Sequence, residues 1–328
     1  MKIISTAFSL LVIGGIAAVG AGAYGKSQFE ASGPSTEPTE VLLKRGSGLN
    51  AIAGTLAKEG VISDALIFRL GAKFKGADRA LKAGEYAIPA GASMQAVLDQ
   101  LTKGDTIQRK VTAAEGLTSF EIVQRVNAAE KMTGEITEIP PEGSLAPETY
   151  FYQRDENRAA LIARMSAAQT AILDELWEKR APDLPLKTKE EALILASIVE
   201  KETGVSSERA RVAAVFINRL NRGMRLQTDP TVIYGITLGK STLGRGIRRS
   251  ELKAETPYNT YVIKGLPPTP IANPGRAAIE ATLNPIASKE LYFVADGTGG
   301  HAFAETLKQH NRNVAEWRKI EKQRKASE

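Results

Sequence analysis

The most informative segment of this chain lies past its midpoint and reads Thr188-Lys189-Glu190-Glu191-Ala192-Leu193-Ile194-Leu195-Ala196-Ser197-Ile198-Val199-Glu200-Lys201-Glu202-Thr203. Thr188 and Glu191 have the capping-box spacing that starts a helix. Seven of the eight residues from 192 to 199 are apolar, so the helix is expected to be buried on most sides. The segment therefore predicts a core helix in the second half of the chain.

Glu200 follows directly after this apolar run. A carboxyl group at the end of an apolar helix loses hydration, which raises its pKa and keeps it protonated long enough to act as an acid. A solvated helix end is the competing interpretation of the same residues. Glu202 lies about 200° further round the helix, so the two carboxylates are not expected to share a face.

Composition narrows the chemistry that the chain can perform. The 328 residues are 43% hydrophobic and 24% charged, which suggests two or three globular domains. The absence of cysteine excludes disulfides, thiolate zinc sites and cysteine nucleophiles. The histidines are His301 and His310, for which we expect structural roles, and the sequence shows no metal or cofactor signal. The net charge of +6 suits an anionic partner such as nucleic acid, acidic lipid or cell-wall glycan.

The N-terminal segment indicates export. Residues 3–24 carry no charge and follow Lys2, and they are numerous enough to cross a bilayer as a helix. Ala21-Gly22-Ala23 has the form of a signal-peptide cleavage site, which is the alternative. We expect residues 1–24 to be a transmembrane anchor, or else a signal peptide, with residues 25–39 as a linker.

Residues 40–104 are expected to form a small α+β module. The pattern predicts strand, helix, helix and strand across residues 41–89, followed by a helix that Ser93 starts and Gly104 ends. This order resembles a LysM-like module, a type that recognises N-acetylated glycans. Residues 105–328 are expected to form a second α+β domain, with a long helix over 157–179 and another over 208–221. In that domain, Asp229 before Pro230 is typical of a helix N-cap followed by proline.

Several longer motifs occur in a specific order from Ala196 onwards. They are Ala196–Thr203, Val215–Leu220, Gly223–Gly235, Tyr258–Tyr261, Gly265–Pro268, Ile271–Gly275, Leu291–Gly297, Gly299–Phe303 and His310-Asn311. Together they resemble the endolytic murein transglycosylase (YceG-like) family, over nearly the whole chain.

The resemblance implies a lyase that cuts the β-1,4 bond between N-acetylmuramic acid and N-acetylglucosamine in nascent peptidoglycan strands. It leaves 1,6-anhydromuramoyl ends, terminates strand elongation and assigns the catalytic acid to Glu200. Because the sugar's own C6 hydroxyl is the nucleophile, one carboxyl group suffices. The expected partners are glycan strands, the membrane and peptidoglycan synthases, not nucleic acid. The expected location is the inner membrane, crossed once, with the catalytic part in the periplasm.

Other polar and aromatic residues are candidates for binding the glycan. Sugar sites use amide hydrogen bonds and stacking on aromatic rings, and these residues fall on or near the loops that surround the catalytic helix. The candidates are Asn218, Gln227, Thr228, Asp229, Tyr258, Asn259 and Tyr261.

Two other functions remain open. A muramidase-type hydrolase would use Glu200 together with a second carboxylate that holds a water molecule, and Asp229 is the best candidate for it. A non-catalytic scaffold would bind glycan through the LysM-like module and recruit cell-wall synthases. The ends of the cleaved strands distinguish the two enzymes, and a Glu200→Gln variant distinguishes either of them from the scaffold.

Overall fold

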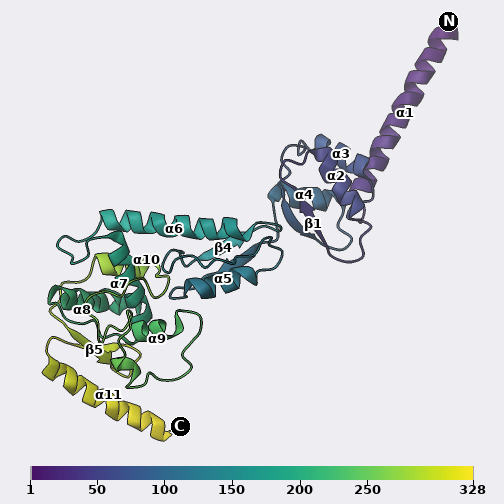
Figure 1. Ribbon diagram of the computed structural model, residues 1–328. Coiled ribbons are helices and arrows are strands. Elements are labelled where there is room, and N and C mark those ends of the chain that lie inside the picture. Colours follow the sequence, from purple (N-terminus) through teal and green to yellow (C-terminus); the bar gives the residue numbers. More distant parts are fainter. Residues whose placement is uncertain (1, 328) are drawn as a thin grey trace. The chain divides into compact units, whose positions relative to one another are not determined.

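The computed structural model describes residues 2–327, and the side chains of residues 13–324. The chain divides into two compact units, Met1–Arg109 and Lys110–Glu328 (Figure 1). Both combine helices with two-stranded sheets, so the predicted α+β class is confirmed. The boundary between the units falls a few residues after the predicted one, which lay between residues 104 and 105.

The first unit has the predicted order of elements across residues 41–89. Strand β1 pairs antiparallel with β2, so that Val41 lies opposite Tyr86. Both residues are buried in a core that the helices complete. The Ser93 side chain accepts a hydrogen bond from Ala96 N to start the last helix, and Gly104 ends it with a φ of 81°. The elements are α1 (Lys2–Glu30), β1 (Thr39–Leu43), α2 (Leu49–Lys58), α3 (Ala65–Phe74), β2 (Gly84–Ile88) and α4 (Met94–Lys103).

The N-terminal helix differs from the prediction. Among the described residues, no helix combines the length and the apolar character needed to cross a bilayer. The transmembrane helix expected over residues 1–24 is therefore not supported, although the side chains of residues 1–12 lie outside the described ones. The described part is rich in glycine and alanine, which add little apolar surface, and α1 continues through Lys26 and Glu30 into the predicted linker.

The second unit begins with a small sheet flanked by two helices. β3 pairs with β4, and the apolar faces of α5 and α6 share a core with them. The predicted long helix is confirmed, with Asn157 as its N-cap. These elements are β3 (Arg109–Thr112), α5 (Ser119–Asn127), β4 (Thr149–Tyr152) and α6 (Arg158–Glu178).

The rest of the second unit is built around α7, the helix predicted from residues 188–203. α7 packs against α6, α8, α9 and α10, and its residues 194–199 are buried. Thr188 is its N-cap, as predicted, and its side chain accepts a hydrogen bond from Glu191 N. A hairpin of β5 and β6 precedes the C-terminal helix. The elements are α7 (Lys189–Glu202), η1 (Ser206–Glu208), α8 (Arg209–Asn221), α9 (Asp229–Thr237), η2 (Glu251–Lys253), α10 (Arg276–Leu283), β5 (Tyr292–Ala295), β6 (His301–Ala304) and α11 (Leu307–Ser327).

Arg158, the first residue of α6, ties α6 to the end of α5. Its guanidinium group donates to backbone carbonyls in the last turn of α5 and in the segment that follows it, at distances of 2.7–3.0 Å. Carbonyls at a helix C-terminus and in the following loop have no partner within the helix, so one side chain satisfies several of them at once. The acceptors are the carbonyl oxygens of Val126, Ala129, Met132 and Gly134.

Replacing Arg158 with methionine is therefore expected to lower the free energy of unfolding by about 3 kcal/mol, because partly buried carbonyls lose a charged donor. Urea unfolding followed by circular dichroism measures the change. The matched control is Arg125→Met, at an exposed position on α5, and it is expected to have a much smaller effect. Equal effects of the two substitutions would contradict the assigned role of Arg158.

Candidate active site

Glu200 lies in the last turn of α7 with only 6% of its side chain exposed. One carboxyl oxygen, Oε2, accepts a hydrogen bond of 2.8 Å from the backbone N–H of Gly275. The other, Oε1, lies 3.8 Å from Nη2 of Arg209. The carboxyl group thus accepts a hydrogen bond from a neutral backbone donor and lies near the Arg209 guanidinium group.

The segment Ile271–Gly275 runs along α7 and supplies the Gly275 donor. One turn before Glu200, the Ser197 hydroxyl accepts a hydrogen bond from Ile271 N and donates to Ile194 O within α7. Gly275 is the N-cap of α10, so the positive end of this helix dipole lies beside the Glu200 carboxyl. Two attachments on one face of α7 therefore position the N–H that bonds Glu200.

Asn273 holds the middle of this segment. Its backbone exchanges hydrogen bonds with Gly116 and Leu117, and its Oδ1 accepts from Leu145 N at 2.9 Å. Its Nδ2 lies 3.1 Å from each of Leu117 O, Ser119 Oγ and Glu142 Oε1. Asn273 is completely buried. The side chain thus joins three stretches of chain that are remote from one another in sequence.

Glu142 is a second carboxyl group beside this segment. It accepts hydrogen bonds from Ser119 N at 2.7 Å and from the Tyr234 hydroxyl at 3.3 Å, in addition to the one from Asn273. Burial raises the pKa of Glu142, while the hydrogen bonds from Ser119 and Tyr234 oppose this shift. Three donors of the protein thus converge on this carboxyl group.

The pKa of Glu200 is raised chiefly by burial, and the negative charge of Glu115 adds to the shift. The Gly275 hydrogen bond, Arg209 and Lys201 act in the opposite direction. Such a group can hold a proton in a dry environment and can still exist as a carboxylate once the proton has left. These are the properties that a general acid which later acts as a base requires.

Glu115 is an exposed acidic residue on the loop that faces Gly275. A Cβ atom on residue 275 would lie 1.9 Å from Glu115 Oε1, so only glycine fits without moving that carboxylate. The same loop is held to α7 by Lys201, whose Nζ donates to Gly116 O at 3.1 Å. The site therefore has a second carboxylate, and that residue is Glu115.

Asp229, which the sequence suggested as the second carboxylate, belongs to a different cluster. Its Oδ1 accepts a hydrogen bond of 2.6 Å from the Tyr261 hydroxyl. Thr228, not Asp229, is the N-cap of α9, and its hydroxyl donates to Glu202. Burial raises the pKa of Glu202, and the charge of Asp229 raises it further. Glu200 and Glu202 thus have separate partners, as the predicted angle between them on the helix requires.

The other predicted binding residues take several positions. Asn218 donates through Nδ2 to Ser288 O and Glu290 O, and Asn259 donates to Glu251 O and Ala254 O, so the structure uses both amides to hold its own backbone. Gln227, in contrast, is exposed.

The remaining candidates for binding the glycan differ in backbone conformation and in exposure. Gln227 has a left-handed φ of 49°, a conformation that costs free energy for a residue other than glycine. The Tyr258 ring lies 5.0 Å from that of Tyr234, and its hydroxyl bonds Thr269. Of the predicted residues, Gln227 and Asp229 are exposed, and Tyr261 is partly buried beside Asp229. Asn218 and Tyr258 are partly buried as well, so Gln227 and Asp229 have the most surface available for contact with a ligand.

Both histidines lie against the terminal hairpin. Nδ1 of His301 is 2.8 Å from Glu208 Oε2, and the His310 ring stacks on Tyr292 at 5.1 Å. Burial lowers the pKa of His310. Within the part of the chain that the structure describes, no group of three or more acidic, histidine or cysteine side chains could hold a metal ion.

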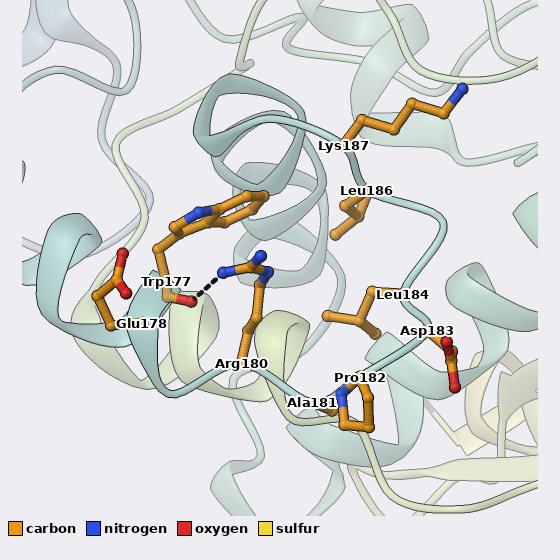
Figure 2. A pocket seen from close by; sticks show the side chains of 9 residues that line it. All are labelled: Trp177, Glu178, Arg180, Ala181, Pro182, Asp183, Leu184, Leu186 and Lys187. Carbon is orange, nitrogen blue, oxygen red and sulfur yellow. Dashed lines mark hydrogen bonds between the residues drawn. The ribbon is translucent and has the colours of Figure 1, made fainter.

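A cavity of about 600 Å³ lies at the turn between α6 and α7, away from the predicted site residues. Figure 2 shows the Arg180 guanidinium beside the Trp177 indole, where it lies 4.1 Å from the ring centroid. Arg180 also donates to Trp177 O. None of the predicted site residues lines this cavity, and we assign it no role in the chemistry of Glu200.

Sequence reasoning singled out Glu200, whose catalytic role stays a prediction, and did not find most of its partners. Asn273 and Gly275 lie in a motif that contributed to the family resemblance, so a signal for them was present. Glu115 and Arg209 gave none, because their proximity to Glu200 arises only in the folded chain. Glu142 lies in a proline-rich loop segment that showed no chemical pattern.

The comparisons with known proteins show which family the chain belongs to. The YceG-like family matches residues 41–316, and the chain belongs to this family. It is 31% identical to the endolytic murein transglycosylase of Bacillus subtilis (strain 168), over 92% of this chain and 90% of that protein. It is also 32% identical to the protein of the same name from Streptococcus pneumoniae (strain D39 / NCTC 7466), over 84% of this chain; the matched part spans 57% of that relative.

A solved structure is similar as well. The crystal structure of a putative yceG-like protein from Listeria monocytogenes has a TM-score of 0.53 and 30% sequence identity. The match covers 85% of this chain and 99% of that one.

The raised pKa of Glu202 predicts how stability depends on pH. The folded state binds this proton more tightly than the unfolded state does, so the resulting stabilisation is complete below the ordinary value of 4.5. It is lost as the pH rises through the folded-state pKa. Glu202→Gln keeps an acceptor for the Thr228 hydroxyl but has no proton to lose. We therefore expect the stability of this variant relative to wild type to be higher at pH 8 than at pH 4. Urea unfolding at both pH values measures this. The exposed Glu135→Gln is the control, and an unchanged pH dependence in Glu202→Gln would refute the assignment.

Proposed function

We propose that this protein is a lytic transglycosylase that cuts peptidoglycan strands internally. It cleaves the β-1,4 bond between N-acetylmuramic acid and N-acetylglucosamine in nascent strands, leaves 1,6-anhydromuramoyl ends and so terminates elongation. The observation that supports this most is the nearly buried carboxyl group of Glu200, whose pKa is raised and which Gly275 N–H orients. Membership of the YceG-like family and the names of the relatives agree with it.

In the first step, the protonated Glu200 donates its proton to the glycosidic oxygen. The bond between that oxygen and the anomeric carbon of N-acetylmuramic acid breaks, and the electron pair stays with the oxygen of the departing N-acetylglucosamine. Burial keeps the proton on Glu200 before the sugar arrives, and general acid catalysis of this kind is worth roughly 10²–10⁴-fold in rate. Glu115 supports the same protonated state through its negative charge.

In the second step, the Glu200 carboxylate removes the proton from the C6 hydroxyl of the same N-acetylmuramic acid. The C6 oxygen forms a bond with the anomeric carbon, which closes the 1,6-anhydro ring and regenerates the protonated acid. Between the two steps Gly275 N–H and the Arg209 guanidinium stabilise the carboxylate. No water is consumed, because the nucleophile is already tethered to the reacting sugar.

The substrate suggests the setting in which the enzyme works. Nascent strands are present where peptidoglycan synthases act, at the outer face of the inner membrane, so we propose that the enzyme works there beside those synthases. The membrane attachment predicted from residues 3–24 and the glycan-binding role of a LysM-like first unit belong to the same proposal. Cell fractionation of wild-type cells, followed by alkaline extraction of the membranes, tests the attachment.

The products of Glu200→Gln test the proposed chemistry. Wild-type protein incubated with peptidoglycan strands of intact ends is expected to release fragments that end in 1,6-anhydromuramic acid, detected by mass spectrometry. Glu200→Gln keeps the acceptor for Gly275 N–H but has no proton to give, so we expect a loss of roughly 10²–10⁴-fold. Glu202→Gln is the matched control on the same helix and is expected to retain most activity.

Other products would replace the proposal by a specific alternative. Ordinary reducing ends would mean that water is the nucleophile, and the structure then directs the search for the second carboxylate to Glu115 rather than to Asp229. Binding of peptidoglycan without any cleavage would support the scaffold.

The charges around Glu200 predict opposite shifts of the pH–rate profile. Removing the cation in Arg209→Met is expected to raise the pKa of Glu200 and to move the alkaline limb of kcat/KM to higher pH. Removing the anion in Glu115→Gln is expected to lower that pKa and to move the same limb to lower pH. Rates of anhydro-product formation between pH 4 and 9 measure both. Shifts in the same direction would exclude Glu200 as the titrating acid.

A further inference from the structure

Helix α3 of the first unit has an apolar face that no described residue of this unit covers. Leu66, Leu70 and Phe74 are spaced four residues apart and therefore lie along one side of the helix. Their exposures are 54%, 58% and 94%. Single exposed apolar side chains are ordinary, but a contiguous row of them marks an interaction surface.

The row continues into a groove between α3 and α1, which lie beside each other in the first unit (Figure 1). The groove has a volume of about 600 Å³ and a mostly apolar lining that includes Gly22, Gly25, Phe29 and Phe74. Gly71 allows this packing, because a Cβ at that position would lie 2.4 Å from the Phe29 ring. The close approach of α1 and α3 thus depends on a glycine at position 71.

Basic side chains surround the apolar row. Lys73 and Lys75 are exposed on α3 and at its end, and the Lys75 ammonium group lies 5.9 Å from the centroid of the Phe29 ring. Lys26 of α1 also lines the groove, together with Glu30, its ion-pair partner at 4.0 Å. Asp64, at the start of α3, is engaged in capping the helix. The rim of the groove therefore has an excess of positive charge.

Along α1, apolar, aromatic and basic residues follow one another in the order in which such residues occur from the acyl region of a bilayer to its phosphates. The exposed apolar side chains of Ile13, Ile16 and Val19 are followed by the exposed Tyr24 and then by Lys26. Aromatic residues prefer the headgroup level of a bilayer, and lysines extend beyond it towards the phosphates. The groove and the row on α3 lie at the Tyr24–Lys26 end of this series.

We propose that the α1–α3 face binds the surface of an anionic phospholipid bilayer. Leu66, Leu70 and Phe74 enter the acyl region, and Lys26, Lys73 and Lys75 lie among the phosphates. This is the arrangement of an interfacial amphipathic helix, which requires no helix that spans the bilayer. A glycan would need hydrogen-bonding groups that the row lacks, and a second copy of the chain would bring a second set of lysines into contact with the first. The inference does not depend on the proposed enzymatic activity.

The fluorescence of a Phe74→Trp variant reports entry into the bilayer. The full-length variant is mixed with vesicles of phosphatidylcholine and phosphatidylglycerol whose acyl chains carry bromine, and the emission of wild type, from Trp177 and Trp317, is subtracted. We expect the remaining emission to be strongly quenched. Lys44→Trp, an exposed position outside the groove lining, is the control and is expected to be quenched little.

Charge variants test the two parts of the surface separately. Phe74→Glu is expected to lower vesicle affinity by roughly tenfold or more, because one fully buried aromatic side chain is lost. Lys73→Gln with Lys75→Gln is expected to lower affinity by roughly tenfold or more for vesicles with phosphatidylglycerol, and to have little effect without it. Circular dichroism confirms that each variant is folded.

Two results would overturn the inference. One is that the emission of the Phe74→Trp variant, after the wild-type emission has been subtracted, is not quenched in protein that sediments with the vesicles. The other is a vesicle affinity that Phe74→Glu leaves unchanged; if the same variant also converts a dimer to a monomer in sedimentation velocity, the face binds a second copy of the chain instead.

Discussion

The candidate site depends on one hydrogen bond between two distant parts of the chain, from Gly275 N–H to the Glu200 carboxyl group. Its donor is a backbone group and cannot be adjusted by a rotamer change. The position of the whole Ile271–Gly275 segment therefore determines its geometry. Ser197 and the buried Asn273 set that position, the first from α7 and the second from the loops on the other side. The surrounding fold provides these attachments.

Opposing electrostatic effects act on Glu200. Burial and Glu115 favour the proton, whereas Gly275, Arg209 and Lys201 favour the carboxylate. A carboxyl group that always kept its proton could not act as the base, and one that was always ionised could not act as the acid. Glu142 and Glu202 are also desolvated, and they too accept hydrogen bonds from the protein, Glu142 from Ser119 N and Glu202 from the Thr228 hydroxyl. Desolvation alone therefore does not single out Glu200 among the three carboxyl groups.

Local patterns predicted the helices well because caps and apolar spacing are local properties. Thr188, Asn157 and Ser93 start their helices where the sequence indicated. Binding residues were harder to predict, because an amide that bonds a sugar and an amide that bonds backbone look alike in sequence. Asn218 and Asn259 prove to hold backbone carbonyls. The membrane helix was expected from the absence of charge over residues 3–24, but no helix among the described residues is long and apolar enough to cross a bilayer. The partners of Glu200 depend on tertiary contacts that no local pattern encodes.

The loop from Gly239 to Tyr258 is tied down at both ends. The Thr118 hydroxyl donates to Gly239 O at one end, and the Tyr258 ring lies against Tyr234 at the other. The residues between these two points include none of those that hold Glu200. This loop can therefore gain, lose or exchange residues in the course of evolution without disturbing the acid.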